Sequence, residues 1–573
     1  MVEHEEDLDS FADWVKRNPV LGYDSESTGL DTFSGDKLRL AQFGTHRESW
    51  VLPAERGEIY RWYAARTLVY AEELICHNAT YDLLVADKHL GVPLESTYHK
   101  TTDTRILSHL VDPRAAHEGG TGHGLEDLTS AYIDRAVAEE VKGSVREMAK
   151  QLKVTKSAFF AAVDIDHPGF NLYAGMDPVL ASLLARQLEK RVPASARRLI
   201  LYEHDVARVC ALMERKGFLV DVPYLEQLHE ELLEEQEFYE DQAATLGLDN
   251  VNAPQQVAAA LMASGVEITG RTPTGKPRVD KRLLEQLAND GHELAAAVMK
   301  AKRASKWRVS YVDAFLDLRD SDNRIHCGIH SLQARTGRMS ITRPALQTLP
   351  SGEHMIRSAF LADAGEVIGS IDYATMELRV LAALSGDRVM QEAFASGADL
   401  HQITADAAGV DRKVGKLSNF QRVYGGGARA LAEATGLPLG TCESVGKAFD
   451  STYTGVAAYS KRLQQQARRD GYITTVTGRR LPVDRSRAYS ALNYMIQSSS
   501  RDVLGRALIS MDEAGLTPHL RLPVHDEVVA SLPKSQAEEI AAEIAAHMRM
   551  ELRGVDIATD AELGGRSWGS LYI

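Results

Sequence analysis

The chain has 573 residues, which is more than one hydrophobic core supports and predicts about three or four domains. Hydrophobic residues make up 44% and charged residues 25%, as in globular proteins, and the absence of long apolar runs excludes a membrane span. The net charge of −15 argues against nucleic acid as a partner unless the cations gather in local patches.

Neither the cysteines nor the first residues point to secretion. The cysteines are far apart and form no C-x-x-C pair, so we expect neither structural zinc nor a disulfide framework. The first ten residues are acidic and lack the apolar core of a secretory signal. These observations predict a cytoplasmic protein.

The first third of the chain has the pattern of an α/β domain. Residues 20–52 predict a strand, a turn and a strand, and helical patterns then alternate with short strands to about residue 190. Residues 188–198 predict a helix end and a linker. From 199 to 320 the pattern is mainly helical, apart from a loop at 270–278 that is rich in turn-forming and basic residues.

Four acids and a tyrosine stand out in this first third. Asp24 and Glu26 end the first predicted strand, where alternation points both carboxylates to the same side, so they repel unless a cation lies between them. Asp82 follows another apolar run. Tyr173 and Asp177 are four residues apart on one face of a predicted helix. Taken singly, each is also typical of a helix cap or a solvated surface.

The mainly helical stretch from 199 to 320 contains a cluster of cations. Five lie within residues 300–308, and they are either a basic track for phosphates or solvated faces of a helix.

Strands return after residue 325, and two of them lead into acids. Residues 367–371 predict a strand that runs into Asp372, and a helix that ends at Gly386 follows. A carboxylate at the tip of a buried strand either caps the next helix or holds a cation. Residues 520–524 and 528–532 predict a hairpin whose tip carries Asp526.

Residues 411–424 predict a helix, with Asp411 as its N-cap. Arg412, Lys416, Phe420 and Tyr424 are spaced four apart and therefore line one helix face as a slow spiral. The face grades from cations to aromatic rings, which suits a ligand with a polyphosphate at one end and rings at the other. The alternative is a solvated cationic turn that leads into a buried aromatic pair.

In their order and spacing, the N-terminal acids and the stretch from Gly124 to Leu128 resemble the 3′–5′ exonucleases that carry four metal-binding acids and a tyrosine. The resemblance spans about residues 15–195. Phosphodiester hydrolysis by two metal ions needs several carboxylates to hold them and a group that orients water. The resemblance implies that Asp24, Glu26, Asp82 and Asp177 are the catalytic metal ligands and that Tyr173 positions the attacking water.

The later motifs resemble family A (Pol I-like) DNA polymerases, over essentially the whole chain. They are the helix at 411–424, Ile371–Arg379, Thr336–Arg338, Gln497 and Val524–Glu527. The resemblance implies an α/β multidomain fold: an RNase H-like 3′–5′ exonuclease domain (1–195) followed by a right-hand polymerase (196–573), with no 5′-nuclease domain. The expected subdomains are a thumb at about 200–325, a palm at about 326–400 and 490–573, and fingers at about 401–489.

The resemblance also implies roles in the polymerase site. Asp372 and Asp526 would hold two Mg²⁺ ions, as in the exonuclease site, with Mn²⁺ as the alternative, and Glu527 would be a less essential acid. The residues expected to bind the dNTP are Arg412, Lys416 and His401 at the triphosphate, Phe420 at the sugar, Tyr424 at the templating base and Glu377 as a steric gate against a 2′-hydroxyl.

DNA contacts are implied as well. Arg338, Asn493 and Gln497 would touch the minor groove, where A·T and G·C pairs look alike, and His525 would support the primer end. Backbone phosphates are expected at the loop 270–278 and at the cations Lys300, Lys302, Arg303 and Lys306.

Three positions depart from the family pattern. Gln421 replaces a glycine and is followed by the run Gly425–Gly427, Tyr489 replaces an arginine, and residues 498–500 are three serines. They put individual DNA contacts in question, and not the chemistry.

Three alternatives compete with a proofreading DNA polymerase. One is a stand-alone exonuclease of the ribonuclease D type with a DNA-binding C-terminal module. The others are a single-subunit RNA polymerase and a catalytically inactive, clamp-like relative. The intact acids and Glu377 favour a DNA polymerase. We expect it to be a monomer that binds primer–template DNA and dNTPs and no membrane, with replisome helicase and primase as candidate partners. A phage replicase in the host cytoplasm and a compact bacterial repair enzyme both fit, and the length and the lack of a 5′-nuclease favour the phage enzyme.

Overall fold

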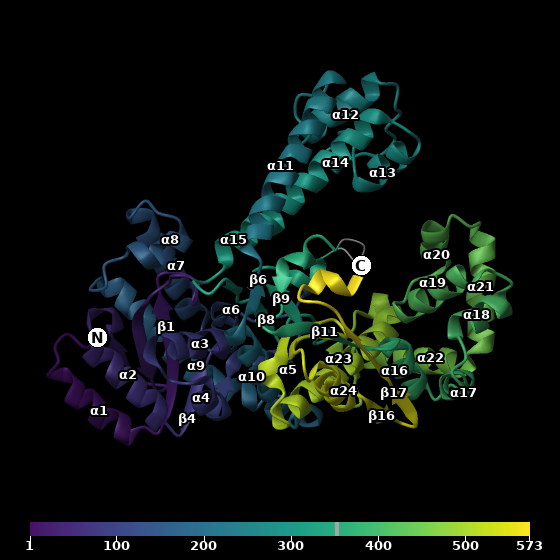
Figure 1. Ribbon diagram of the computed structural model, residues 1–573. Helices are drawn as coiled ribbons and strands as arrows, with labels where there is room; N and C mark the ends of the chain where they lie inside the picture. Colours follow the sequence, from purple (N-terminus) through teal and green to yellow (C-terminus); the bar gives the residue numbers. More distant parts are fainter. Residues whose placement is uncertain (350–353, 573) are drawn as a thin grey trace. The chain divides into compact units, whose positions relative to one another are not determined.

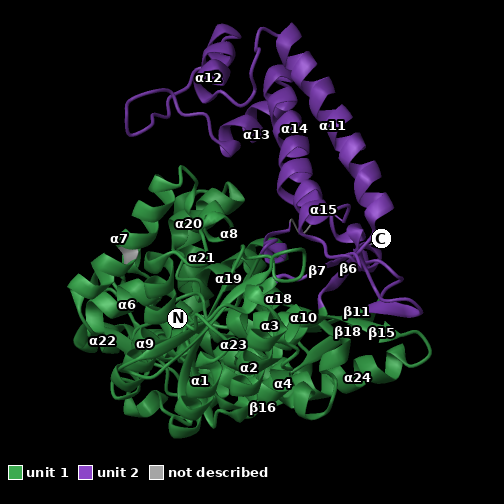
Figure 2. Ribbon diagram, turned by 90° about the vertical axis from the view of Figure 1, so that its left-hand side faces the viewer, with its two compact units in different colours: residues 1–216, 328–342, 369–563 green, residues 217–327, 343–368, 564–573 purple. Residues whose placement is uncertain are grey.

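The computed structural model describes residues 1–349 and 354–572. The chain divides into two compact units (Figure 2). Unit 1 comprises residues 1–216, 328–342 and 369–563, and unit 2 comprises residues 217–327, 343–368 and 564–573. No helix within the described ranges is long and apolar enough to cross a membrane.

The N-terminal part of unit 1 is built on a five-stranded sheet of order β3-β2-β1-β4-β5 (Figure 1). Its central strand, β1, pairs antiparallel with β2 and parallel with β4, and every residue of β2 is buried. The predicted strand–turn–strand is confirmed. The strands are β1 (Val20–Ser27), β2 (Leu38–Gly44), β3 (Ser49–Leu52), β4 (Glu73–Cys76) and β5 (Thr101–Asp103).

Helix α9 (Pro168–Glu189) packs against β1 at very short range. A Cβ atom at Gly22 would lie only 2.2 Å from the carbonyl oxygen of Pro178, so only glycine permits this approach. The contact fixes the neighbouring turn of α9 against the strand. The other helices here are α1 (Asp7–Arg17), α2 (Glu58–Tyr70), α3 (Ala79–Leu90), α4 (Leu94–Thr97), α5 (Thr104–Val111), α6 (Leu125–Tyr132), α7 (Arg135–Gln151) and α8 (Lys156–Ala162).

A second sheet, of order β14-β15-β11-β18, carries the later acids. The predicted strand before Asp372 and the predicted hairpin are both confirmed, and the helix after the strand ends at Gly386 in a left-handed conformation. The elements are β11 (Glu366–Tyr373), α16 (Met376–Ser385), α23 (Ala491–Glu513), β14 (Leu520–Val524), β15 (Glu527–Pro533), α24 (Ala537–Met548) and β18 (Thr559–Leu563). Two-stranded ribbons join β8 (Gly328–His330) to β9 (Ser340–Thr342), β12 (Tyr472–Thr474) to β13 (Arg480–Pro482) and β16 (Met550–Leu552) to β17 (Val555–Ile557).

Residues 388–470 consist of helices and the turns that join them. They have a small core of their own, made by Val414, Leu431, Cys442 and Val445. The predicted helix at 411–424 is confirmed as α19, and the carboxylate of its N-cap, Asp411, accepts from the Val414 amide at 3.0 Å. The helices are α17 (Arg388–Ser396), α18 (Leu400–Ala408), α19 (Arg412–Val423), α20 (Ala428–Thr435), α21 (Leu439–Thr452) and α22 (Thr454–Asp470).

Unit 2 is organised around two long helices, α11 and α14, that run side by side (Figures 1 and 2). Its small sheet has the order β10-β6-β7 and packs around Phe218, Phe360 and Trp568. The elements are β6 (Phe218–Val220), α11 (Val222–Thr245), α12 (Pro254–Ala263), α13 (Lys281–Asn289), α14 (Glu293–Trp307), α15 (Ala314–Leu318), β7 (Arg324–Ile325) and β10 (Phe360–Leu361).

A cluster of four buried charges ties the two parts of unit 1 together. Glu203 lies on α10 (Leu199–Lys216), within the range expected for the thumb, although α10 belongs to unit 1. Its carboxylate accepts from the guanidinium groups of Arg479 and Arg501, and Arg479 also donates to Asp502 at 2.9 Å. All four residues are at most 4% exposed. Two cations and two anions therefore compensate one another where water cannot.

Neutralising Glu203 should destabilise the fold strongly. Glu203→Gln leaves the two buried guanidinium groups with Asp502 as their remaining carboxylate in the cluster, and removing one partner of a buried ionic group costs about 3–5 kcal/mol. Urea unfolding should show this loss. The matched control is Glu139→Gln, which breaks the exposed pair between Arg135 and Glu139. This control should leave the free energy of unfolding nearly unchanged, because the pair is exposed to solvent, and equal effects of the two variants would contradict the role of the cluster.

Two candidate active sites

The first site gathers three carboxylates from β1 and α9. One oxygen each of Asp24, Glu26 and Asp177 can be chosen so that all three lie within 4.8 Å of one another. The alternation of β1 places the first two on one side, and the close packing at Gly22 brings the turn of α9 that carries Asp177 against them. Three carboxylates at this distance can act as oxygen ligands for a hard divalent cation, which prefers oxygen ligands.

Asp82, the fourth predicted acid, is adjacent but is held differently. One of its carboxylate oxygens accepts from the backbone amide of Ser25 at 3.0 Å and from its hydroxyl at 2.7 Å. Asp82 lies in the first turn of α3 and is buried, and its charge raises the pKa of both Asp24 and Glu26. The structure therefore brings all four acids together, although Asp82 lies outside the tight group of three.

The environment of these acids opposes their ionisation. Burial and the neighbouring carboxylates raise the pKa of Asp24 and of Glu26 well above their ordinary values. Burial is the largest cause of the raised pKa of Asp82, about 8, and of Asp177, about 7. Such carboxylates gain from a nearby positive charge, so a metal cation fits the site.

Tyr173 lies one helical turn before Asp177 and hydrogen-bonds to it, as the four-residue spacing predicts. The negative charge of Asp177 and burial raise the pKa of the Tyr173 phenol. The hydroxyl therefore keeps its proton at neutral pH and can donate it in a hydrogen bond.

Sequence reasoning missed two residues at this site. Gln42 lies opposite Asp24 in the β1–β2 register and is fully buried, and within the described part of the chain its side-chain amide finds no partner. Glu126 on α6 raises the pKa of Asp177 and Tyr173 by its charge. The place of Gln42 depends on the cross-strand register, which cannot be deduced from one strand alone. The stretch from Gly124 to Leu128 is part of the predicted exonuclease pattern, but the sequence assigns no role to Glu126 itself.

The second site lies at the ends of neighbouring strands of the other sheet. The amide of Tyr373, next to Asp372, donates to the carbonyl oxygen of Asp526 at 3.2 Å. Desolvation by the surrounding protein, with the charges of Asp526 and Glu527, raises the pKa of Asp372 to about 7. Asp560 lies on β18, directly opposite Asp372 in the β11–β18 register. It adds another carboxylate that sequence reasoning missed.

Asp372 lies near the end of the predicted strand, but its own side chain faces outward. Ile371 and Tyr373 are buried, but strand alternation turns Asp372 outward, and its side chain is exposed. Glu527 accepts from the Ser370 hydroxyl at 2.6 Å, which fixes its carboxylate beside the pair. His525 is exposed at the tight hairpin turn, with a positive φ of 59°.

Helices α18 and α19 bring the expected triphosphate-binding residues together. The Nδ1 atom of His401 accepts a hydrogen bond from the Asn419 side-chain amide at 3.1 Å, and its ring lies 5.7 Å from that of Phe420. Burial and the charges of Arg412 and Lys416 lower the pKa of His401, against the opposing effect of Asp399. Lys416 is exposed, and Arg412 forms an ion pair with Asp399 at 2.5 Å.

Close packing fixes this arrangement. A Cβ atom at Gly415 would lie 2.4 Å from the carbonyl oxygen of His401, so glycine lets α18 and α19 touch. Inside, the hydroxyl of Thr404 donates to the Asn419 side chain at 2.7 Å, and Tyr453 contacts Thr404 at 2.9 Å.

The glycine run after α19 ends the helix. Gly425 has φ of 74°, and the amides of Gly425 and Gly426 donate to the carbonyl oxygens of Arg422 at 3.4 Å and Gln421 at 2.7 Å. This is the Schellman pattern of helix termination, which favours glycine in the left-handed position. Tyr424 is thus the C-cap of α19, one residue beyond its last helical residue, and it is exposed.

Glu377, Arg338 and Tyr424 form one group. Arg338 makes an ion pair with Glu377, and both interact with the phenol of Tyr424. Burial, followed by the hydrogen bond to Glu377, raises the pKa of Tyr424 to about 12. The expected gate, DNA-contacting arginine and base-contacting tyrosine therefore meet at one place.

Asn493 and Gln497 lie one turn apart near the start of α23. The Asn493 side-chain nitrogen is buried, and no acceptor for it is found within residues 1–349 and 354–572. Ser498, Ser499 and Ser500 are buried within the same helix, so these family departures are part of its packing and do not face a ligand.

The predicted basic track on α14 is only partly free. Lys300 donates to the Tyr239 hydroxyl at 3.0 Å, and Arg303 pairs with Glu235 at 3.0 Å, both on α11. Burial lowers the pKa of Lys302, and Lys306 is exposed. The expected loop at 270–278 is confirmed as a loop between α12 and α13.

Comparison with known proteins defines the class. Residues 222–570 match the family model of DNA polymerase family A, and residues 1–193 match that of a 3′–5′ exonuclease. The chain therefore belongs to the family A DNA polymerases and carries a 3′–5′ exonuclease domain, a class of proteins that uses divalent metal ions. The match beyond residue 222 excludes a stand-alone exonuclease.

Phage enzymes are among its most similar relatives. The chain is 49% identical to the DNA polymerase of Mycobacterium phage L5 and 48% identical to that of Mycobacterium phage D29. Each alignment covers 100% of this chain and 97% of the relative. DNA polymerase I of Pseudomonas aeruginosa is 28% identical over 93% of this chain and 62% of its own length.

The fold also matches a solved structure. The POL domain of Pol1 from M. smegmatis, in complex with DNA primer-template and dNTP, superposes with a TM-score of 0.78 over 98% of both chains, at 24% sequence identity. This likeness supports the fold.

Without divalent metal, the stability of this protein should fall as pH rises. The folded-state pKa values of Asp177 (about 7) and Asp82 (about 8) exceed the ordinary 3.8. The folded chain therefore binds more protons than the unfolded chain between about pH 4 and 8, and this stabilisation is lost as pH rises through the folded values. Thermal unfolding in EDTA at pH 5.5 and pH 8 measures the effect.

Mg²⁺ at pH 8 should restore part of the lost Tm, because it neutralises the same carboxylates. The double variant Asp24→Asn, Glu26→Gln removes two of the repelling charges and should have the shallower pH dependence in EDTA. The same pH dependence in the variant and the wild type would show that the cluster is not its source.

Proposed function

We propose that this chain replicates phage DNA in the host cytoplasm, adding dNTPs to a primer 3′-hydroxyl and removing mispaired ends in its exonuclease domain. The observation that carries the polymerase site is the placement of Asp372 and Asp526 at neighbouring strand ends, within one sheet. Identity of 49% to the polymerase of Mycobacterium phage L5, over nearly all of both chains, supports replication over bacterial repair.

Each active site is proposed to hold two Mg²⁺ ions. Asp372 and Asp526 would hold them in the polymerase site, and Asp24, Glu26, Asp82 and Asp177 in the exonuclease site. Bound metal ions supply Lewis acidity: they lower the pKa of a hydroxyl or water and neutralise developing negative charge on phosphate. The fit rests on carboxylate oxygens as donors and on raised pKa values that a cation would relieve.

The residues of α19 orient the incoming nucleotide. Arg412, Lys416 and His401 bind its triphosphate, Phe420 packs on the sugar and Tyr424 lies beside the templating base. The ion pairs of Arg412 with Asp399 and of Arg338 with Glu377 hold these side chains in place before the substrate arrives. Preorganised cations stabilise charge as it develops without reorganising at the moment of reaction.

In this proposal, the primer–template lies along the DNA-contacting residues expected in the other subdomains. Arg338, Asn493 and Gln497 reach the minor groove, with the unpartnered Asn493 amide as a donor for a base edge. His525 supports the primer end. Lys302, Lys306 and the loop 270–278 meet backbone phosphates, with a smaller part for Lys300 and Arg303, which already have partners on α11.

In the exonuclease site, Tyr173 orients the attacking water. Its phenol keeps its proton because the charge of Asp177 raises its pKa. Its O–H donates to Asp177, which leaves the phenol oxygen to accept a hydrogen bond from the water, while the carboxylates would hold the metal ions.

The two activities should be separable by mutation, because each site is built from its own set of acids. Asp24→Ala with Glu26→Ala should lower primer digestion by at least about a hundredfold, as removing a charge-stabilising group typically does, and leave extension intact. Asp526→Ala should do the reverse. A gel that follows a labelled primer with and without dNTPs measures both. Asp13→Ala, at an exposed acid, is the control, and joint loss of both activities in either variant would refute two independent sites.

Sugar selection should depend on the volume of Glu377 and not on its charge. Glu377→Ala opens the space that a ribose 2′-hydroxyl needs, and the ratio of kcat/KM for dNTP over rNTP should fall at least about tenfold, or 1.4 kcal/mol. Glu377→Gln keeps the volume while it breaks the ion pair with Arg338, so it should retain most of the discrimination. Equal losses in the two variants would assign selection to the ion pair and overturn the steric gate.

A further inference from the structure

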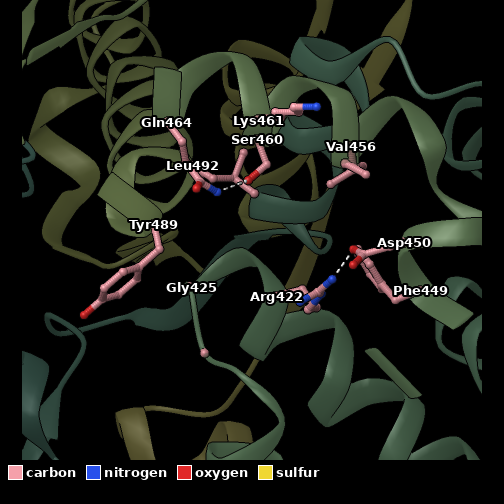
Figure 3. A pocket seen from close by; sticks show the side chains of 12 residues that line it. Arg422, Gly425, Phe449, Asp450, Val456, Ser460, Lys461, Gln464, Tyr489 and Leu492 are labelled. Carbon is pink, nitrogen blue, oxygen red and sulfur yellow. Dashed lines mark hydrogen bonds and ion pairs between the residues drawn. The ribbon is translucent and has the colours of Figure 1, made fainter. Parts of the chain in front are cut away.

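A pocket of about 390 Å³ opens beside the end of α19 (Figure 3). Its walls come from α19, α21, α22 and the segment that leads into α23, all within unit 1. The volume lies in the range of small-molecule sites and accommodates a nucleotide. The lining residues that matter here are Arg422, Gly425, Asp450, Lys461, Gln464 and Tyr489.

The pocket begins where the expected contact with the templating base ends. Gly425, in its wall, directly follows Tyr424. A Cβ atom at Gly425 would lie 3.4 Å from the carbonyl oxygen of Tyr489 and 3.5 Å from its ring, so the glycine turn and Tyr489 are in contact. If the templating base lies beside Tyr424, as proposed, the next nucleotide of the template strand lies at this glycine turn.

Tyr489 gives the pocket an aromatic rim. Its side chain is 54% exposed, and in Figure 3 the ring extends away from the ion pair of Arg422 and Asp450. An exposed ring costs little to desolvate and offers a face to any base, and base–aromatic stacking is sequence-tolerant for that reason. This position is one of the three departures from the family pattern, which has an arginine here.

The rest of the lining is polar, with more positive than negative charge. Asp450 neutralises Arg422, whose guanidinium also lies over the Phe449 ring. Lys461 is exposed on α22, and no partner for its ammonium is found in the part of the chain that the structure describes. Gln464 accepts from Arg468 at 3.4 Å. Cations beside an aromatic ring suit the phosphate and base of a single strand.

We propose that this pocket binds the first unpaired template nucleotide beyond the templating base, with its base stacked on Tyr489 and its phosphate near Lys461. The proposal rests on the proposed polymerase function and adds a subsite to it. The contact does not depend on the identity of the base, so the subsite can bind each template nucleotide in turn before that nucleotide is copied.

The test compares primer–templates whose template overhang is one nucleotide or three nucleotides long. The wild type should use the longer overhang with the higher kcat/KM for DNA, because only that template reaches the pocket. In Tyr489→Ala the ratio of the two kcat/KM values should fall by about fivefold or more, the size expected for one lost stacking contact. Tyr489→Phe, which keeps the ring, should retain the ratio.

Binding is also followed directly. A template with 2-aminopurine next to the templating base should show quenched fluorescence in the wild type and in Tyr489→Phe, and recovered fluorescence in Tyr489→Ala. Lys461→Ala should make binding of the three-nucleotide overhang less sensitive to salt. Tyr70→Ala, at a tyrosine on α2 with 53% exposure, is the matched control and should change neither readout.

The outcomes separate this subsite from the polymerase function. A wild type that extends both substrates with the same kcat/KM refutes the subsite and leaves the polymerase intact, whereas a wild type that extends neither refutes the proposed function. Fluorescence that is quenched equally in Tyr489→Ala would also refute the subsite, because it would place the stacked base elsewhere.

Discussion

Repulsion between carboxylates is the constraint on which both active sites depend. Asp24, Glu26 and Asp177 are held together although each raises the cost of ionising the others, and Asp372 and Asp526 share the same difficulty at a more exposed place. Such groups would separate if their supports were loose. The supports are accordingly backbone features: the register of β1, the contact of α9 at Gly22 and the tight hairpin at His525.

The same principle places the nucleotide-binding side chains. Glycine at position 415 removes the one methyl group that would separate α18 from α19, and the buried bonds of Asn419 then set the ring of His401. Glycine at 425 ends α19 at Tyr424, whose phenol interacts with Glu377 and Arg338. Close backbone contacts therefore fix the distances between the side chains of the cationic face, just as strand register fixes the distances between the acids.

Features set by local spacing could be predicted from the sequence, and features set by tertiary register could not. The strands that lead into Asp24 and Asp372, the cap at Asp411 and the face of α19 follow from short-range patterns. Gln42 and Asp560 reach their sites only through partner strands, and Glu203 meets its arginines from far along the chain. The apolar neighbours of Asp372 predict the strand but not the exposure of the acid, because alternation buries Ile371 and Tyr373 and turns the acid between them outward.

The buried charges at Glu203 also bear on how such enzymes can evolve by exchange of parts. A recombination event that joined the first 216 residues of one relative to the remainder of another would pair the glutamate of α10 with arginines selected in a different background. Any mismatch would strand a charge in the interior, where no solvent compensates it. Functional chimaeras should thus inherit residues 203, 479, 501 and 502 as one block. A junction placed before α10, at the end of the exonuclease domain, would leave the cluster intact.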